Sequence, residues 1–489
     1  MPPSGARKTA VELALVVTSK LAACGAAWGL GFRAVSDDDF ARVVLAQELA
    51  HAPRLDPTGT SWLPLPFWLT GGLMRALGDT SLTVARTAAV ALGLASAALV
   101  YAAARILVRD RRAALAGALL AAVFPWSARL GVATVPELPT AAMSLFGAAT
   151  LATPSTKARF AGAALLSCAC LCRYEPWPLA VAFALATLFE RDARSGSLAT
   201  RASSAALALV GPAAWLLHNR IAHGEALHFL GRVSAYRRAV AGEASLHDLV
   251  AYPLALVREE PELWLVAAGA TLVGTRPLLG ARFARPAVAL TSMVALLSAA
   301  AMRGGAPTHH AGRAVLAVWL AVAVYAGAAI ATAFLRGRPE RRAVLALSAA
   351  SIALGVLILR PWYARLDSMT TRTRELSIGA AASALPRDAR VLVEVRDFGF
   401  FAVEAASGAP WNFVLDRELD PRVAARESSF ATAALLERRI AAVRATHVVG
   451  EVSEATRHLG PPLAMADGLG LFRVEPSPDP TTSAPRPAP

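Results

Sequence analysis

The sequence is poor in charge, in lysine and in cysteine. Only 17% of its 489 residues are charged, against about 25% in an ordinary soluble domain. Its four cysteines, Cys24, Cys168, Cys170 and Cys172, lack the C-x2-C spacing of a structural zinc site. We therefore interpret them as packing residues. No glycine motif of the P-loop or Rossmann kind joins a strand to a helix, which argues against a nucleotide-driven transporter and against a nucleotide-sugar enzyme.

What the chain does have is apolar sequence. Its residues are 55% hydrophobic and its mean hydropathy is +0.47. Apolar runs of about 18 residues recur, and each is long enough to cross a bilayer as a helix. The net charge of +14 comes from short arginine clusters between these runs, which is the pattern of topology signals rather than of a nucleic-acid surface. The composition therefore predicts an α-helical, multi-pass membrane protein.

The apolar pattern predicts about eleven spans. They lie near 11–31, 83–108, 113–127, 136–152, 158–172, 176–189, 202–219, 262–275, 285–302, 314–335 and 342–359. The first is expected to be an uncleaved span, because Lys20 interrupts it and no convincing cleavage site follows. Arginines gather in alternate loops, which places the N-terminus in the cytoplasm and the C-terminus outside. We expect the inner membrane of a bacterium.

After the last span the pattern changes to that of a small α/β domain. We expect a transmembrane domain over 1–360, a connecting helix over 361–385, an extracytoplasmic α/β domain over 386–475 and a disordered proline-rich tail over 476–489. Within the α/β domain, strands are predicted over 389–395, 446–452 and 468–475, and a helix over 428–444.

Three consecutive aspartates, Asp37, Asp38 and Asp39, come directly after the first predicted span. Aspartate is favoured at a helix start, because it accepts hydrogen bonds from free N–H groups and opposes the helix dipole. This explains one or two of the three. Residues 40–49 then read as an amphipathic helix at the membrane surface. Asp56 follows in "LDPTGTSW", a segment that is expected to fold back towards the aspartates.

Several segments, taken in order, carry a resemblance to a known class. The acidic pair and Phe40 open the first outer loop, and "WLPL" and "GDTSLTVARTAAVALGLASAALVYAAARIL" follow. Later come "FPWSARLGVATVPELPTAAMSLF", "CRYEPWPLAVAF" and "HHAGRAVLAVWLAVAV". Over most of the chain this order resembles the GT-C class of integral-membrane glycosyltransferases, which includes protein O-mannosyltransferases, aminoarabinose transferases of lipid A and enzymes of lipopolysaccharide core assembly.

The resemblance implies a glycosyltransferase that moves one sugar, a hexose or a pentose, from a polyprenyl-phosphate carrier to a lipid, glycan or protein acceptor. In that reaction the acceptor loses a proton, which a carboxylate can take. We expect Asp37 to be the general base, with Asp38 as its partner or as a metal contact. The register stays open by one residue, so Asp38 with Asp39 is the alternative pair. Glu137 is a further catalytic candidate, because acidic groups near a membrane are costly; the alternative is a helix cap.

The leaving phosphate needs fixed cations, and guanidinium groups match phosphate well. Arg313, His309 and His310 open a late span on the outer side, where a helix N-terminus adds positive charge; the alternative is a basic anchor at the membrane surface. Further candidates are Arg129, Arg173 and Glu175, of which the last two can equally form a structural ion pair.

A divalent metal, magnesium or manganese, stays open; Asp38 is one possible contact, and His309 and His310 could instead ligate a metal together with an aspartate. Two other functions also stay open. A transporter or flippase of lipid-linked sugars would place its charges near the bilayer midplane and show repeated halves. An inactive scaffold would use the outer domain to bind a partner. Acidic residues that gather in outer loops favour the transferase.

Overall fold

The computed structural model describes residues 4–59, 62–190, 196–241, 245–272, 281–304, 311–335, 371–422 and 426–475. The chain divides into two compact units, which are treated separately below. The first comprises 1–39, 54–70 and 86–370, and the second comprises 40–53, 71–85 and 371–489.

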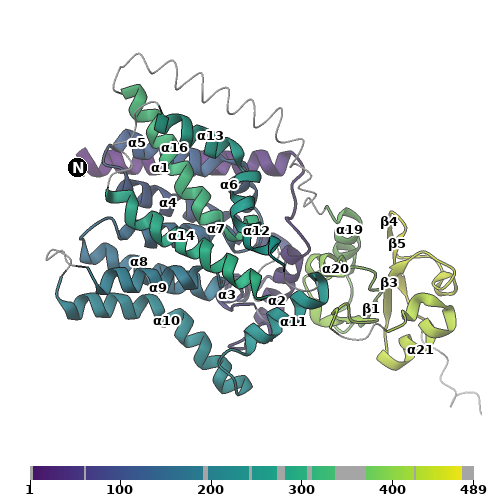
Figure 1. The fold of residues 1–489 in the computed structure, drawn as a ribbon. Coiled ribbons are helices and arrows are strands. Elements are labelled where there is room, and N and C mark those ends of the chain that lie inside the picture. The colour runs from purple at the N-terminus through teal and green to yellow at the C-terminus, as the bar shows by residue number, and fades with distance from the viewer. Residues whose placement is uncertain are drawn as a thin grey trace, which may run out of the picture. The chain divides into compact units, whose positions relative to one another are not determined.

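The first unit is built from helices (Figure 1). Along the chain the structure has α1 (Ser4–Gly29), α2 (Asp38–His51), α3 (Leu65–Leu77), α4 (Leu82–Leu107), α5 (Arg111–Val123), α6 (Pro125–Leu130), α7 (Glu137–Thr150) and α8 (Thr156–Cys172). It continues with α9 (Pro176–Leu188), α10 (Leu198–His223), α11 (His228–Ala241), α12 (His247–Arg258), α13 (Pro261–Leu272), α14 (Ala281–Met302), α15 (Ala311–Ala314) and α16 (Leu316–Leu335). Helices α2, α3 and α4 each have residues in both units.

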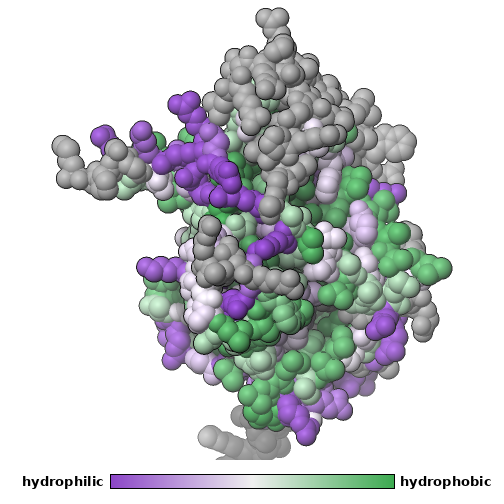
Figure 2. Space-filling model, turned by 60° about the vertical axis from the view of Figure 1, so that its left-hand side comes forward, coloured by the Kyte–Doolittle hydropathy of each residue, from purple (hydrophilic) through white to green (hydrophobic). Residues whose placement is uncertain are grey.

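Four of the described helices are long and apolar enough to cross a membrane, within Ala6–Gly29, Leu82–Leu107, Arg282–Met302 and Leu316–Ala333. They coincide with four of the predicted spans. Large side chains such as Leu15, Leu21 and Val288 are exposed on these helices, and Figure 2 shows broad hydrophobic surface. The fold is thus that of a mostly helical membrane protein. The number eleven is not confirmed, because other predicted spans form shorter or less apolar helices, and 342–359 lies outside the described residues.

Small residues let two of the central helices approach closely. A Cβ atom on Gly117 of α5 would lie 2.4 Å from the Val324 carbonyl oxygen of α16, and one on Gly327 would lie 2.6 Å from the Ala116 carbonyl oxygen. Backbones this close exclude any side chain at the crossing, as is common where membrane helices pack. The alanine-rich composition therefore serves tight helix packing.

Lys20 of α1 has hydrogen-bond partners outside its own helix. The side chain is fully buried, and its Nζ donates to Ser127 Oγ at 2.9 Å and to the Ser127 carbonyl oxygen. A buried ammonium group needs such acceptors, since an unpaired charge is very costly there. The contact joins α1 to α6.

The second unit contains a small α/β sheet at the C-terminal end of the chain. Its elements are α19 (Thr373–Ala382), β1 (Val391–Val393), α20 (Phe400–Ser407), β2 (Phe413–Leu415), α21 (Ala433–Val443), β3 (His447–Glu451), β4 (Ala464–Ala466) and β5 (Leu469–Arg473). The strand order is β2-β1-β3-β5-β4, with β1 parallel to β2 and β3, and β5 antiparallel to β3 and β4.

Alternating side chains cover the two faces of this sheet. Val391 and Val393 of β1 pack with α19 and α20. Leu392 packs on the opposite face with Leu436 and Ile440 of α21. A period of two along a strand produces this division. The predicted strands are present over slightly shorter ranges. Helix α19 lies within the range predicted for a connecting helix, 361–385, of which 361–370 lies outside the described residues. The 476–489 tail also lies outside them.

Candidate functional site

The three aspartates differ in environment. Helix α2 begins at Asp38, and Asp39 is buried, with 2% of its surface exposed. Its Oδ2 accepts from the backbone N–H groups of Val35 at 2.9 Å and Ser36 at 3.3 Å, and its Oδ1 accepts from the Thr134 N–H at 2.9 Å. Burial raises the pKa of Asp39 to about 6, although Arg313 and these N–H groups lower it. Asp39 therefore joins the loop after α1 to the segment before α7.

Asp38 is the aspartate that faces a cation. Its side chain is 38% exposed, and its Oδ2 lies 3.5 Å from Nη1 of Arg313. The same nitrogen lies 3.4 Å from Ser36 Oγ. Both contacts are long for hydrogen bonds to a guanidinium group. Asp38 is thus held loosely beside a fixed positive charge and stays open to solvent.

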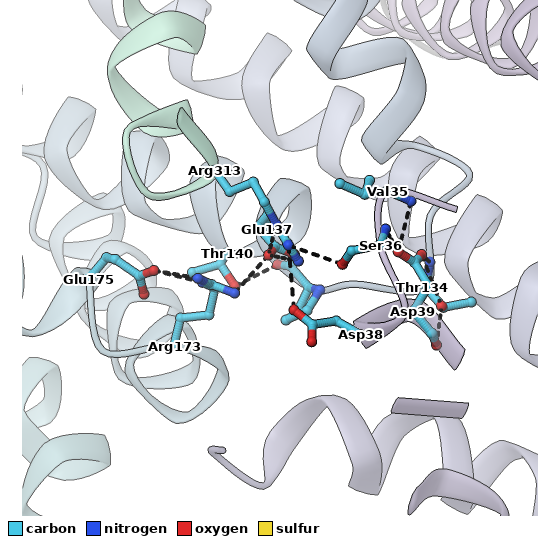
Figure 3. Close-up of polar contacts among 11 residues, drawn as sticks. Val35, Ser36, Asp38, Asp39, Thr134, Glu137, Thr140, Arg173, Glu175 and Arg313 are labelled. Atoms are coloured by element: carbon cyan, nitrogen blue, oxygen red, sulfur yellow. Dashed lines mark hydrogen bonds and ion pairs between the residues drawn. The ribbon is translucent and has the colours of Figure 1, made fainter. Parts of the chain in front are cut away.

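Glu137 lies at the centre of the site (Figure 3). It is the first residue of α7 and is 2% exposed. Its Oε1 accepts from Arg173 Nη1 at 2.8 Å and from Arg313 Nε at 2.8 Å and Nη2 at 2.7 Å. Arg173 also pairs with Glu175, at 2.9 Å from Nε. One buried carboxylate therefore orients two guanidinium groups from segments far apart in the sequence.

The carboxylates of Glu137 and Glu175 match the two guanidinium groups of Arg173 and Arg313 in number, and Asp38 adds one further negative charge. Although burial lowers the pKa of Arg173, the neighbouring Glu137 and Glu175 raise it overall. Arg313 lies in the single helical turn α15, directly before α16, and is 5% exposed. Because the protein interior screens charge poorly, both guanidinium groups exert strong fields on anything bound beside them.

Two cavities adjoin these residues. A small one, of about 20 Å³, is lined by Glu137, Arg173, Glu175 and Arg313 together with residues of α7, α14 and α16. A larger one, of about 180 Å³, is mainly apolar and is lined by Tyr174, Trp177, Pro178, Phe229, Leu230, Val233, Leu296, Leu297 and Ala300. The segment 173–178 contributes to both, so a polar cavity and an apolar cavity share one wall.

A second group of side chains has the character of a metal site. Ligand atoms of Asp56, His218 and His223 lie within 4.8 Å of one another. Asp56 Oδ1 accepts from the N–H groups of Thr58 at 3.0 Å and Gly59 at 3.2 Å. Its Oδ2 lies 3.6 Å from His218 Nε2. Two imidazoles and one carboxylate, with the carboxylate oriented by other hydrogen bonds, are a donor set typical of zinc.

The structure thus brings Asp38, Glu137, Arg173, Glu175 and Arg313 together. Asp37 is half-buried and Arg129 belongs to α6, while the predicted phosphate ligands His309 and His310 lie outside the described residues. Asp56 lies near His218 and His223 and is not part of the group around Glu137.

Sequence reasoning missed His218 and His223, and also the anchors of Asp39. The H-x4-H spacing of the two histidines falls within the range common at zinc sites and was a usable signal. For Ser36 and Thr134 no such signal existed.

Comparisons with known proteins bear on the fold. A family model described as dolichyl-phosphate-mannose-protein mannosyltransferase matches residues 57–217. No curated protein sequence matches the chain.

Among solved structures, ArnT from Cupriavidus metallidurans bound to undecaprenyl phosphate aligns with a TM-score of 0.57 at 15% identity, over 96% of this chain and 99% of ArnT. The Archaeoglobus fulgidus oligosaccharyltransferase in its apo form aligns with a TM-score of 0.51 at 14% identity, over 90% of this chain and 69% of that enzyme.

The chain has a GT-C fold. The resemblance drawn from its sequence is confirmed by the family model and by both structures. These matches support a membrane glycosyltransferase of the GT-C class.

Because Asp39 is buried and hydrogen-bonded while Asp38 is partly exposed, we expect substitutions at the two residues to have different effects on stability. Asp39→Ala leaves the buried N–H groups of Val35 and Thr134 without an acceptor, at about 1–3 kcal/mol for each group. We expect its unfolding temperature in detergent to fall by several degrees. Asp38→Asn, at a side chain that is 38% exposed, is the matched control and should melt within about a degree of the wild type. Equal melting of both variants would contradict the structural role of Asp39.

Proposed function

We propose that this protein transfers a single sugar from a polyprenyl-phosphate-linked donor to a lipid, glycan or protein acceptor at the outer face of a bacterial inner membrane. The observation that carries the proposal is the arginine pair Arg173 and Arg313, oriented by the buried Glu137 beside the open carboxylate of Asp38. The proposed topology keeps the N-terminus in the cytoplasm and the α/β domain of 386–475 outside.

Arg313 and Arg173 are suited to hold the phosphate of the donor. Glu137 accepts hydrogen bonds from Nε and Nη2 of Arg313. The orientation of the Arg313 guanidinium group is therefore set before the donor binds. Nη1 makes only long contacts, to Asp38 and Ser36, so its N–H groups can donate to an anion without rotation of the guanidinium group. As the bond from the sugar to the phosphate oxygen breaks, the phosphate gains charge, which these cations stabilise. In this role Glu137 is a positioning residue.

The larger cavity is suited to the lipid part of the donor. Its lining is apolar and it begins at Tyr174, next to the arginine that would hold the phosphate. A prenyl chain gains about 25 cal/mol for each Å² of apolar surface that it removes from water. ArnT from Cupriavidus metallidurans, whose fold this chain shares, was solved with undecaprenyl phosphate bound, which supports a donor of this chemistry.

Asp38 is the carboxylate best placed to act as the general base. A base must reach the acceptor, and the Asp38 side chain is open to solvent, whereas Asp39 is buried in hydrogen bonds. The acceptor O–H or N–H would give its proton to Asp38, its oxygen or nitrogen would bond to the sugar, and the polyprenyl phosphate would leave with the electron pair. Asp37, expected from the resemblance to be the base, is then its partner.

We further infer that Asp56, His218 and His223 bind a divalent metal, and that the metal is zinc rather than magnesium or manganese. Imidazole nitrogens suit zinc, while magnesium takes oxygen ligands and keeps several waters. One crystal structure of the Archaeoglobus fulgidus oligosaccharyltransferase contains zinc and sulfate, which supports a metal in a neighbour with this fold. A bound metal would supply a fixed positive charge at this group.

The choice between Asp38 and Asp37 is tested by transfer assays with purified protein in proteoliposomes. Loss of a general base typically costs 10²–10⁴-fold, so we expect Asp38→Asn to lower the transfer rate at least about 100-fold, with insertion unchanged. Asp37→Asn should lower it less, by about tenfold. The reverse order would return the role of base to Asp37, and full activity in both variants would rule out this acidic pair.

The metal assignment is tested by elemental analysis of the purified protein. We expect about one zinc per chain in the wild type and a loss of most of it in His218→Ala, whose imidazole is an expected ligand. His51→Ala, a histidine on α2 that is not in the group, is the control and should keep its zinc. A wild type that carries no zinc, or an unchanged zinc content in His218→Ala, would refute the site.

A further inference from the structure

The sheet of the second unit has a charged edge with no role in the proposed transfer. The chain leaves β1 through α20 to reach β2 on one side, and then returns through α21 to reach β3 on the other side of β1. Helices α20 and α21 cover opposite faces. The carboxyl ends of β1 and β3 therefore form a topological switch point, where open α/β sheets commonly bind their ligands.

Charged groups from three segments meet at this point. Glu451, at the end of β3, accepts through Oε1 from Arg374 Nη1 at 2.8 Å and from Arg396 Nη1 at 2.9 Å. Its backbone N–H donates to Glu394 Oε2 at 2.8 Å. Glu394 and Arg396 follow β1, and Arg374 belongs to α19. The side chains are thus held in place by one another.

This network keeps hydrogen-bonding capacity. Glu394 Oε1 lies 3.8 Å from Arg396 Nε, which is too far for a hydrogen bond. The Arg396 side chain is 59% exposed, and a guanidinium group carries five N–H donors. An exposed donor, Arg396, therefore lies beside an acceptor, Glu394, whose side chain is 14% exposed.

An aromatic side chain flanks the same edge. Phe398, two residues after Arg396, is 39% exposed, and its ring lies nearly parallel to that of Phe401, with 6.4 Å between the centroids. An exposed phenylalanine offers an apolar face against which a flat apolar surface can stack. Three guanidinium groups and four carboxylates gather here, from Arg372, Arg374, Arg396, Glu375, Glu394, Asp397 and Glu451.

We propose that this edge binds a neutral carbohydrate. A sugar ring has an apolar C–H face that stacks on Phe398, and neighbouring hydroxyls that donate to Glu394 and accept from Arg396. No other ligand class combines these needs as well with an overall negative site. That the bound sugar is part of the acceptor rests on the proposed function; the binding itself does not.

Saturation-transfer NMR on the full-length protein in nanodiscs tests the proposal. The probes are the methyl glycosides of mannose, glucose, galactose and rhamnose, with inorganic phosphate as a competing anion. At least one glycoside should show a signal in the wild type that falls to background in Arg396→Ala and in Phe398→Ala. Both side chains are exposed, so the fold should survive, and circular dichroism verifies this.

Two matched variants separate this site from the transfer site. Arg438→Ala removes an exposed arginine of α21, on the other face of the sheet, and should keep the signal. Asp38→Asn should also keep it while sugar transfer is lost, so failure of the proposed function and failure of this site are distinguishable. The proposal is overturned if no glycoside gives a signal, if the signal survives both Arg396→Ala and Phe398→Ala, or if phosphate displaces the glycoside.

Discussion

The contact on which the candidate site depends is the one between Glu137 and two arginines. Its single oxygen Oε1 receives three N–H groups, from Arg173 and Arg313, in a place that is closed to water. Removing one partner of such a buried pair is strongly destabilising, because it leaves an uncompensated charge. The start of α7, the turn before α9 and the turn before α16 are therefore held in one arrangement, and the cations that would meet a phosphate have fixed orientations.

Asp38 and Asp39, at the end of the loop after α1, have different environments beside this centre. Both the side chain and the carbonyl oxygen of Asp39 accept hydrogen bonds from Thr134, which anchor the loop to it. Asp39 therefore has a structural role. Asp38, one residue earlier, is left at the edge beside Arg313 with an open side chain. One residue of register thus separates a buried, hydrogen-bonded carboxylate from one that is open to solvent, because the start of α2 turns the two side chains in different directions.

Periodicity predicted many of the helices and three of the five strands of the C-terminal sheet, because burial of an apolar face leaves a repeat in the sequence. The three-residue strands β2 and β4 were not predicted. The number of spans was harder, since short helices such as α7 and α9 (Pro176–Leu188) are not distinguished from spans by composition alone. The acidic and basic candidates were also readable from the sequence. The ion pair between Arg173 and Glu175, one of the alternatives from the sequence, is present. The pairing of Glu137 with Arg313 was not readable, because these residues are 176 residues apart and meet only through tertiary packing.

The two proposed binding sites differ in kind. The Glu137 centre is buried and offers cations to an anion, while the sheet edge at Arg396 is exposed and offers paired charges to neutral hydroxyls. A transferase needs both kinds of recognition, one for a phosphate-linked donor and one for a hydroxyl-rich partner. The sheet edge can be tested by binding alone, without a knowledge of the donor.

The most direct test of the central claim, transfer from a polyprenyl-phosphate sugar, is mass spectrometry of lipids and envelope glycans from cells with and without this protein. The account predicts that loss of the protein leaves one envelope glycan, lipid or glycoprotein short of a single sugar, while the same sugar accumulates on polyprenyl monophosphate. Unchanged envelope molecules, with no accumulated polyprenyl-phosphate sugar, would contradict it.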